Sequence, residues 1–198
     1  MEKVSMLDRA SASCIYGAKD NGEHVMVDGR YKMTCVGPDG ALKWEEEFDN
    51  IVTAQGKAHL LDHGLAGPAT AVAVRMLLIT SGTPVAGDTY ATHAGFTEFT
   101  HIAALGTPSW SASSGADAVT KATSANVSFN INAGSGVNVT GCGIVLVVGT
   151  VGNLGVVGDT ATSGAKLYSA GAFTTGGTKV VSNGDTLNVG YTASISAG

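Results

Sequence analysis

Apolar and polar residues alternate along two neighbouring segments near the start of the chain, Tyr31 to Val36 and Leu42 to Phe48. The alternation is interrupted only by Glu46, which falls on the apolar side of the second segment. A period of two is typical of a strand with one buried face. Pro38-Asp39-Gly40 between the segments has the composition of a tight turn. We therefore predict a β-hairpin over residues 31–48.

A different period follows, with small or apolar residues recurring at helical spacing. Thr53 is suited to cap a helix N-terminus, and Gly64 is suited to the position just after a helix. This pattern predicts one amphipathic helix over residues 53–64. The apolar positions with the helical spacing are Ala54, Ala58, Leu61 and Leu65.

The remainder of the chain has the pattern of short strands separated by glycine-containing turns. Val72 to Ile79 is a continuous apolar run and predicts a buried strand, whereas residues 80–125 are rich in loop-forming residues. Regular spacing of short strands is typical of a sandwich or barrel. The later predicted strands are Val127–Ile131, Val137–Val148, Lys166–Tyr168, Lys179–Val181 and Thr186–Ile195.

Composition limits the classes to which this chain can belong. Its 198 residues are 44% hydrophobic and only 14% charged, with a formal net charge of −5. This size fits one domain, and the low charge argues against a disordered chain. The acidic balance argues against a surface that coats nucleic acid. The most apolar run, Ile144 to Val148, is far shorter than a membrane span, and the first residues contain no secretion signal. We therefore expect synthesis in the cytoplasm and no membrane partner.

Charged residues are concentrated at the start of the chain. Residues 1–62 contain seven Lys or Arg and eleven Asp or Glu, whereas residues 100–198 contain three Lys and three Asp. Because interface cores are depleted in charge, we interpret the second half as a surface covered by other subunits. The acidic run Glu45-Glu46-Glu47 with Asp49 is predicted to be a solvated strand face. A contact with a basic partner remains an alternative.

Two groups of histidines and acids are the candidates for chemistry. His59 and His63 have the i, i+4 spacing of zinc ligands on a helix, but Leu60 stands where the zinc-protease pattern requires Glu. His93 and His101 flank Glu98, and Asp88 lies upstream. Neither group meets a spacing rule for a metal or acid–base site, and no nucleophile or phosphate-binding motif occurs. We predict no enzyme, no catalytic residue, no cofactor and no metal site.

Three cysteines, Cys14, Cys35 and Cys142, are widely spaced and odd in number. They form neither a disulfide framework nor a zinc motif, because no CxxC pair occurs. We predict three reduced thiols, with a bridge between Cys14 and Cys35 as the alternative.

A series of residues and short motifs that spans most of the chain has a familiar type and order. These residues are Trp44, Asn50-Ile-Val-Thr53, Gly56, Leu60-Leu61-Asp62, Leu77-Leu-Ile-Thr80, Asp88-Thr89, His93, Gly95-Phe96, Glu98, Phe129-Asn-Ile131, Gly141, Ala170, Phe173, Gly184-Asp185-Thr186-Leu187, Val189 and Tyr191. In them the chain resembles a family of small virion structural proteins of tailed bacteriophages, the capsid decoration or cement proteins. The first 30 residues are outside the resemblance.

The resemblance implies a mainly β, jelly-roll-like sandwich that binds the outside of a capsid shell. On this interpretation residues 1–30 are an N-terminal arm, and residues 31–198 are the sandwich domain with the hairpin and the helix. The implied partners are the major capsid protein and further copies of the chain, as a dimer or trimer. The expected contact elements are the arm and the Gly/Ser/Thr-rich loops 106–118 and 149–165.

Three other functions remain open on the sequence. A tail, collar or fibre protein has similar Gly/Ser/Thr/Asn-rich β-structure. A carbohydrate-binding sandwich is possible if Trp110 is exposed to stack on a sugar. A metallohydrolase would use His59, Asp62 and His63.

Overall fold

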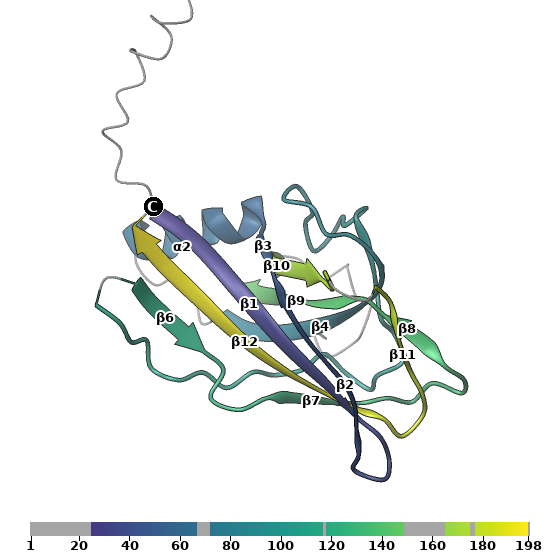
Figure 1. Cartoon of the computed structure of the whole chain (residues 1–198). Coiled ribbons are helices and arrows are strands. Elements are labelled where there is room, and N and C mark those ends of the chain that lie inside the picture. Colours follow the sequence, from purple (N-terminus) through teal and green to yellow (C-terminus); the bar gives the residue numbers. More distant parts are fainter. Residues whose placement is uncertain (1–24, 67–71, 117, 149–164, 175–176, 198) are drawn as a thin grey trace, which may run out of the picture.

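Two antiparallel sheets packed face to face form the body of the protein in this computed structural model, which describes residues 25–66, 72–116, 118–148, 165–174 and 177–197 (Figure 1). The predicted mainly β sandwich is therefore confirmed, and its jelly-roll connectivity stays a prediction. Sheet A has the order β2 (Leu42–Asp49), β1 (Val25–Val36) and β12 (Thr186–Ala197), with β6 (Ala118–Ala122) and β7 (Val127–Asn130) along the far side of β12. Sheet B has the order β3 (Ile51–Val52), β10 (Ala165–Ala172), β9 (Gly141–Val148), β4 (Val72–Gly82) and β5 (Phe96–Glu98). A separate small sheet pairs β8 (Val137–Val139) with β11 (Lys179–Val181).

The predicted hairpin is confirmed as the pair β1–β2, in which Tyr31 lies opposite Phe48. Its turn is closed by a hydrogen bond of 2.9 Å from the Gly40 amide to the Gly37 carbonyl, and Gly40 adopts a positive φ of 79°. Strand β1 begins at Val25, six residues before the predicted start, and pairs with β12 from that residue onward. Residues 25–30 thus belong to sheet A rather than to an arm, and residues 1–24 lie outside the described residues.

The main core lies between the two sheets. Alternate residues of β1 and β12 point into it, among them the fully buried Tyr31, Met33 and Val189. Their rings and aliphatic chains pack against Met76 of β4 and other residues of sheet B. The alternation in the sequence predicted this face correctly, because β1 and β12 direct alternate residues into the core and toward solvent.

The middle of strand β4, Met76 to Ile79, has no solvent face, which explains its uninterrupted apolar run. Met76 and Leu78 point into the main core, whereas Leu77 and Ile79 enter a second cluster on the far side of sheet B. That cluster is completed by residues from the segment between β4 and β6, including Tyr90 and Leu105. The segment predicted as loop-rich therefore covers the second face of sheet B, and it contains the short strand β5.

The predicted strand Val137–Val148 is two strands, which is a correction. Residues 137–139 pair with β11, and residues 141–148 pair with β4 and β10. The change of sheet occurs at Thr140 and Gly141. A Cβ atom on Gly141 would lie 2.0 Å from the Gly171 carbonyl oxygen, so only glycine permits this approach. Periodicity cannot reveal such a change, because the apolar alternation continues across it.

The helix α2 (Ala54–Ala66) lies at the end of the sandwich where β1 begins and β12 ends (Figure 1). The hairpin turn between β1 and β2 lies at the opposite end. Among the described residues, the structure contains no helix long and apolar enough to cross a membrane.

Candidate interaction surface

Helix α2 is held against strand β10 through its first turn. The Thr53 amide donates to the Tyr168 carbonyl at 3.0 Å, and the Thr53 hydroxyl donates to the Leu167 carbonyl. The same hydroxyl oxygen accepts from the Gly56 amide at 3.1 Å, which is the predicted N-cap. The Leu167 amide in turn donates to Oε1 of Gln55 at 2.9 Å. These bonds satisfy the edge of β10 and fix how α2 is rotated about its axis.

The helix turns the predicted apolar face away from the core, which is a correction. Ala54, Ala58, Leu61 and Leu65 are all exposed. The buried side is formed by Gly56 and His59, with Gln55, Leu60 and His63 half-buried. Gly56 determines which side of the helix faces the sheet, because it is the position at which the helix backbone comes close to β10. The prediction that Gly64 follows the end of the helix is also wrong, because Gly64 lies inside α2.

Large apolar side chains are consequently exposed on α2 and on the strands beside it. Leu61 is 63% exposed and Leu65 is 86% exposed. At the start of β1, Val25 is 68% exposed and Met26 is 49% exposed. We call the exposed side chains of α2 and the start of β1 the apolar end: Val25, Met26, Leu61 and Leu65. A group of large exposed apolar side chains at one end of a folded protein makes this end a candidate interaction site.

Further exposed apolar side chains lie on the inner face of sheet A, beyond the part that packs in the core. Val27 of β1 lies opposite Ile195 of β12, and Ile195 lies opposite Val119 of β6. Ile195 and Val119 are 42% and 41% exposed. Directly opposite residues of an antiparallel pair share one face, so these side chains form a row on the core-facing side that sheet B does not fully cover.

The two histidines of α2 lie side by side, with ring centroids 4.0 Å apart. They line a pocket of about 340 Å³ together with Trp110, Leu146 and Tyr168. Burial lowers the pKa of His59 below its ordinary value, and the neighbouring His63 and Lys166 lower it further. Asp62 is exposed and lies 3.8 Å from the Lys166 ammonium. In the described part of the chain, no three or more His, Cys, Asp or Glu side chains gather as a metal cluster.

The second histidine group shapes a loop. The Asp88 carboxylate accepts hydrogen bonds from the amides of Val85 at 2.9 Å and Gly95 at 3.2 Å. His93 lies with its Nε2 3.5 Å from Oε1 of Glu98, and its Nδ1 is 2.9 Å from the Tyr90 carbonyl oxygen. The structure thus brings Asp88, His93 and Glu98 into one loop region. The ring of His101 packs instead against Phe99.

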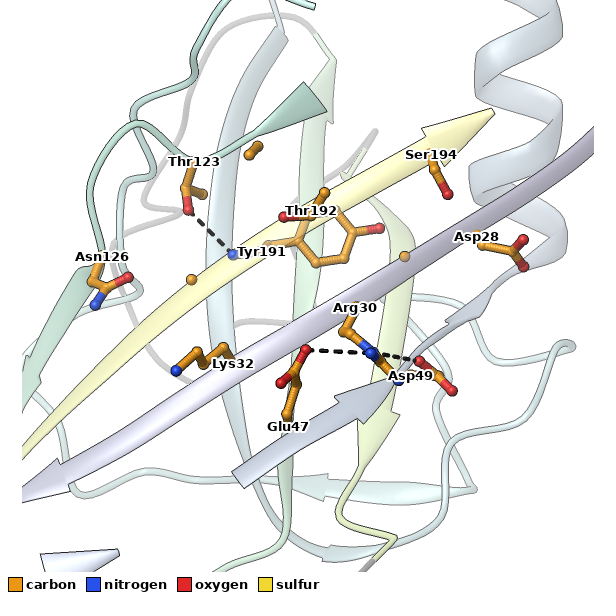
Figure 2. A pocket seen from close by; sticks show the side chains of 13 residues that line it. Asp28, Arg30, Lys32, Glu47, Asp49, Thr123, Asn126, Tyr191, Thr192 and Ser194 are labelled. Carbon is orange, nitrogen blue, oxygen red and sulfur yellow. Dashed lines mark hydrogen bonds and ion pairs between the residues drawn. The ribbon is translucent and has the colours of Figure 1, made fainter. Parts of the chain in front are cut away.

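Each acid in the run of β2 is paired with a cation of the protein itself. Glu45 pairs with Lys32 at 3.1 Å, and Glu46 pairs with Lys179 at 2.7 Å. Glu47 and Asp49 both pair with Arg30, at 3.4 Å and 3.0 Å. The Arg30 pairs lie beside a shallow polar pocket of about 590 Å³ on the outer face of sheet A (Figure 2). The acids of this run therefore already have partners within the protein, and they do not form an unpaired acidic patch for a basic partner.

Trp110 is half-buried, and its ring lies edge-on to Tyr191 with centroids 6.2 Å apart. Its backbone forms a bridge with Thr123, and the Ser114 backbone bonds Thr120, so part of the 106–118 loop folds back along β6. Within the described residues no aromatic side chain is fully exposed. Trp110 is thus not an open aromatic platform, because its half-buried ring lines the pocket beside His59 and His63. Residues 149–164 of the other predicted contact loop lie outside the described residues.

Comparisons with protein-family models, with curated proteins and with solved structures give no match for this chain.

Sequence reasoning missed Val25, Met26 and the solvent-facing orientation of Leu61 and Leu65. One signal was present in the sequence. A glycine inside a helix, here Gly56, often marks a close packing contact. Taking Gly56 as the packed position would have placed Leu61 and Leu65 on the outer side.

Proposed function

We propose that this chain is a non-enzymatic structural protein of a tailed-bacteriophage virion, located on the outside of the capsid. It binds across the joints between major capsid protein subunits and stabilises the shell as a cement or decoration protein. The observation that carries this proposal is the exposure of Leu61 and Leu65 on the solvent face of α2. The resemblance of the sequence supports the identity of the partner.

The charge distribution supports an apolar contact. The acids of β2 are already paired with Arg30, Lys32 and Lys179, so they add little attraction toward a charged partner. The exposed pairs of Arg30 and Lys32 contribute weakly to association. Burial of apolar side chains is then the main available source of binding free energy.

A physical mechanism follows from binding to the assembled shell alone. A protein that binds only the assembled state stabilises it by mass action. Many identical copies on one particle make individually weak contacts effective, and a dimer or trimer of the chain would add to this effect.

Placement in a tail, collar or fibre is the alternative within the same class of particle. Among the described residues, no Phe, Tyr or Trp side chain is exposed as the carbohydrate-binding alternative requires, and Trp110 is half-buried against Tyr191. We therefore favour the capsid, and copy number per particle separates it from the tail.

The proposal is tested by adding purified protein to particles that lack it and measuring bound copies after sedimentation. Leu65→Ser should lower the apparent affinity about tenfold or more, as expected for an apolar side chain buried in an interface. Leu42→Ser is the matched control, because Leu42 is 62% exposed on β2 and does not belong to the apolar end. Equal binding by the two variants would contradict the proposal for this surface.

A further inference from the structure

A pocket of about 340 Å³ lies between the two sheets at the end of the sandwich where helix α2 is placed (Figure 1). Val74 of β4 and Leu146 of β9, which lie opposite each other in sheet B, form one wall. Ala193 of β12 lines the pocket from sheet A, and His59 and Leu60 line it from α2. A packed protein interior seldom leaves a space of this size between two layers.

The sequence leaves this space because small side chains and a histidine stand where large apolar side chains would fill it. Ala193 of β12 lies opposite Gly29 of β1 at the level of the pocket. Helix α2 directs His59 inward and turns Leu65 outward. The helix therefore covers this end of the sandwich without filling it.

The walls of the pocket are mainly apolar and aromatic. Trp110 and Tyr191 lie edge-on to each other there, and Tyr168 lines the pocket from β10. Small-molecule sites are typically concave and apolar, with a few polar groups that fix the ligand. Since an apolar cavity of about 150 Å³ holds one benzene ring, a pocket of about 340 Å³ suits a flat ligand of about two fused rings.

One buried polar side chain of the pocket has no hydrogen bond of its own. His59 is only 8% exposed, and within the described residues neither of its ring nitrogens has a hydrogen-bond partner. Its ring lies beside that of His63, which also lines the pocket. Buried polar groups are nearly always hydrogen-bonded. An acceptor atom of a ligand in the pocket would supply the partner that His59 lacks.

The charge of the walls favours a negatively charged ligand. Lys121 of β6 is the one formally charged side chain among the described residues that line the pocket, and no Asp or Glu is among them. The Lys121 ammonium donates to the Ser111 carbonyl at 3.0 Å, which leaves two of its three N–H donors for a ligand. The acid of α2, Asp62, lies 3.8 Å from the Lys166 ammonium and does not line the pocket.

We propose that this pocket binds a small aromatic carboxylate of about two fused rings. The rings lie between Leu146 of sheet B and Ala193 of sheet A, beside Trp110. The carboxylate accepts a hydrogen bond from His59 and is attracted by the ammonium of Lys121. A sugar does not fit, because the apolar walls would leave most of its hydroxyl groups without hydrogen bonds.

This inference does not depend on a role in a virion. Leu61 and Leu65 do not line the pocket, so a partner surface on the outer side of α2 and a ligand in the pocket are compatible. The two are tested by different measurements, and each can fail without the other.

Titration of the full-length chain with 2-naphthoate, followed by methyl and amide NMR at pH 7.5, tests the site. We expect saturable shifts of the Val74, Leu146 and Ala193 methyl signals and none at Leu65, with a dissociation constant below about 1 mM. The neutral isostere 2-naphthamide should bind at least fivefold more weakly. Lys121→Met should remove most of this preference for the charged ligand.

A pair of matched variants separates the pocket from the outer surface. Ala193→Leu places a larger side chain in the pocket and should weaken binding of 2-naphthoate at least tenfold. Ala58→Leu makes the same change on the exposed face of α2 and should leave binding unchanged. An unshifted Met33 methyl signal shows that each variant keeps its core.

Four results would overturn the proposal. They are the absence of saturable shifts in the unaltered chain, shifts centred on Leu65 instead of the pocket, equal binding by the Ala193 and Ala58 variants, and binding of 2-naphthamide as tight as that of 2-naphthoate.

Discussion

Gly56 of helix α2 lies against the backbone of Tyr168 in β10, so closely that a Cβ atom there would be 2.2 Å from the Tyr168 carbonyl oxygen. The contact is with backbone, which cannot move aside as a side chain can. Together with the bonds of Thr53 and Gln55 to β10, it fixes the side of α2 that faces the sandwich. The exposure of Leu61 and Leu65 follows from it.

Replacing Gly56 should therefore separate α2 from β10. We expect Gly56→Ala to lower the free energy of unfolding by about 1–3 kcal/mol, the usual cost of forcing extra volume into a packed site. Gly64→Ala is the matched control, since it lies in the same helix with nothing within 4 Å of the added Cβ. That variant should gain about 0.5–1 kcal/mol. Urea unfolding measures both, and equal effects would contradict the packing argument.

The carboxylate of Asp185 should make the fold sensitive to acid. It is 1% exposed and accepts hydrogen bonds from Lys43 Nζ at 2.7 Å and the Ser182 amide at 2.8 Å. Burial alone would raise the pKa of Asp185, but these bonds outweigh it and hold the pKa below its ordinary value. Because the folded pKa is lower than the unfolded one, the stabilisation is complete above about pH 4 and is lost as the pH falls further.

Asp185→Asn should thus destabilise the protein at pH 7 by about 1–3 kcal/mol. The difference from the unaltered chain should shrink as the pH is lowered below 4. Glu47→Gln is the control, because its pair with Arg30 is exposed and should contribute no measurable stability. A difference that is constant from pH 7 to pH 3 would contradict the assignment.

The thiols of Cys35 and Cys142 should be unreactive in the folded protein. Both are fully buried free cysteines. Burial, and then the Asp185 carboxylate, raise the pKa of Cys35 to about 11, and burial raises that of Cys142 well above its ordinary value. In a Cys14→Ser chain at pH 8, a thiol reagent should label neither until denaturant is added. Rapid labelling of the native chain would contradict this.

His59 should weaken the fold when it is protonated. Its pKa is lowered by burial first and then by the neighbouring His63 and Lys166, so the unfolded chain binds its proton more readily than the folded chain does. Stability is therefore complete above about pH 6.5 and decreases as the pH falls below that value. His59→Gln should reduce this dependence between pH 7.5 and 5.5. If the pH dependence of stability is the same in His59→Gln as in the unaltered chain, His59 is not the source of that dependence.

The strands could be predicted from alternation where one face is buried and the other is exposed to solvent. This holds for the hairpin of Tyr31 and Phe48 and for the last strand. It failed at Thr140, where the chain passes from one sheet to another without any change of period. It also failed at residues 25–30, since their place in β1 depends on pairing with residues of β12 more than 150 positions away in the sequence.

The helix could be predicted, but its orientation could not. Apolar spacing placed Leu61 and Leu65 on the inner side, whereas bonds between Thr53, Gln55 and the edge of β10 place them outside. Periodicity counts only the residues of the helix itself. The setting of α2 depends on backbone groups of a strand that is distant in the sequence, and only the tertiary structure reveals them.

The histidine candidates show the same limit. His59 and His63 have ligand spacing and do lie side by side, but Asp62 points to Lys166 on the surface. The proximity of His93 and Glu98 could be anticipated because they are five residues apart. The neutralisation of Glu46 by Lys179 could not, since the two lie on strands far apart in the sequence.

The most direct test of the proposed role is the copy number of this chain in purified virus particles, measured by quantitative mass spectrometry against the major capsid protein. A cement protein that binds the shell predicts a ratio near one, or a simple fraction of it. A ratio of a few per cent would contradict placement on the capsid and assign the chain to the tail or connector. Absence from the particles would contradict a virion role altogether.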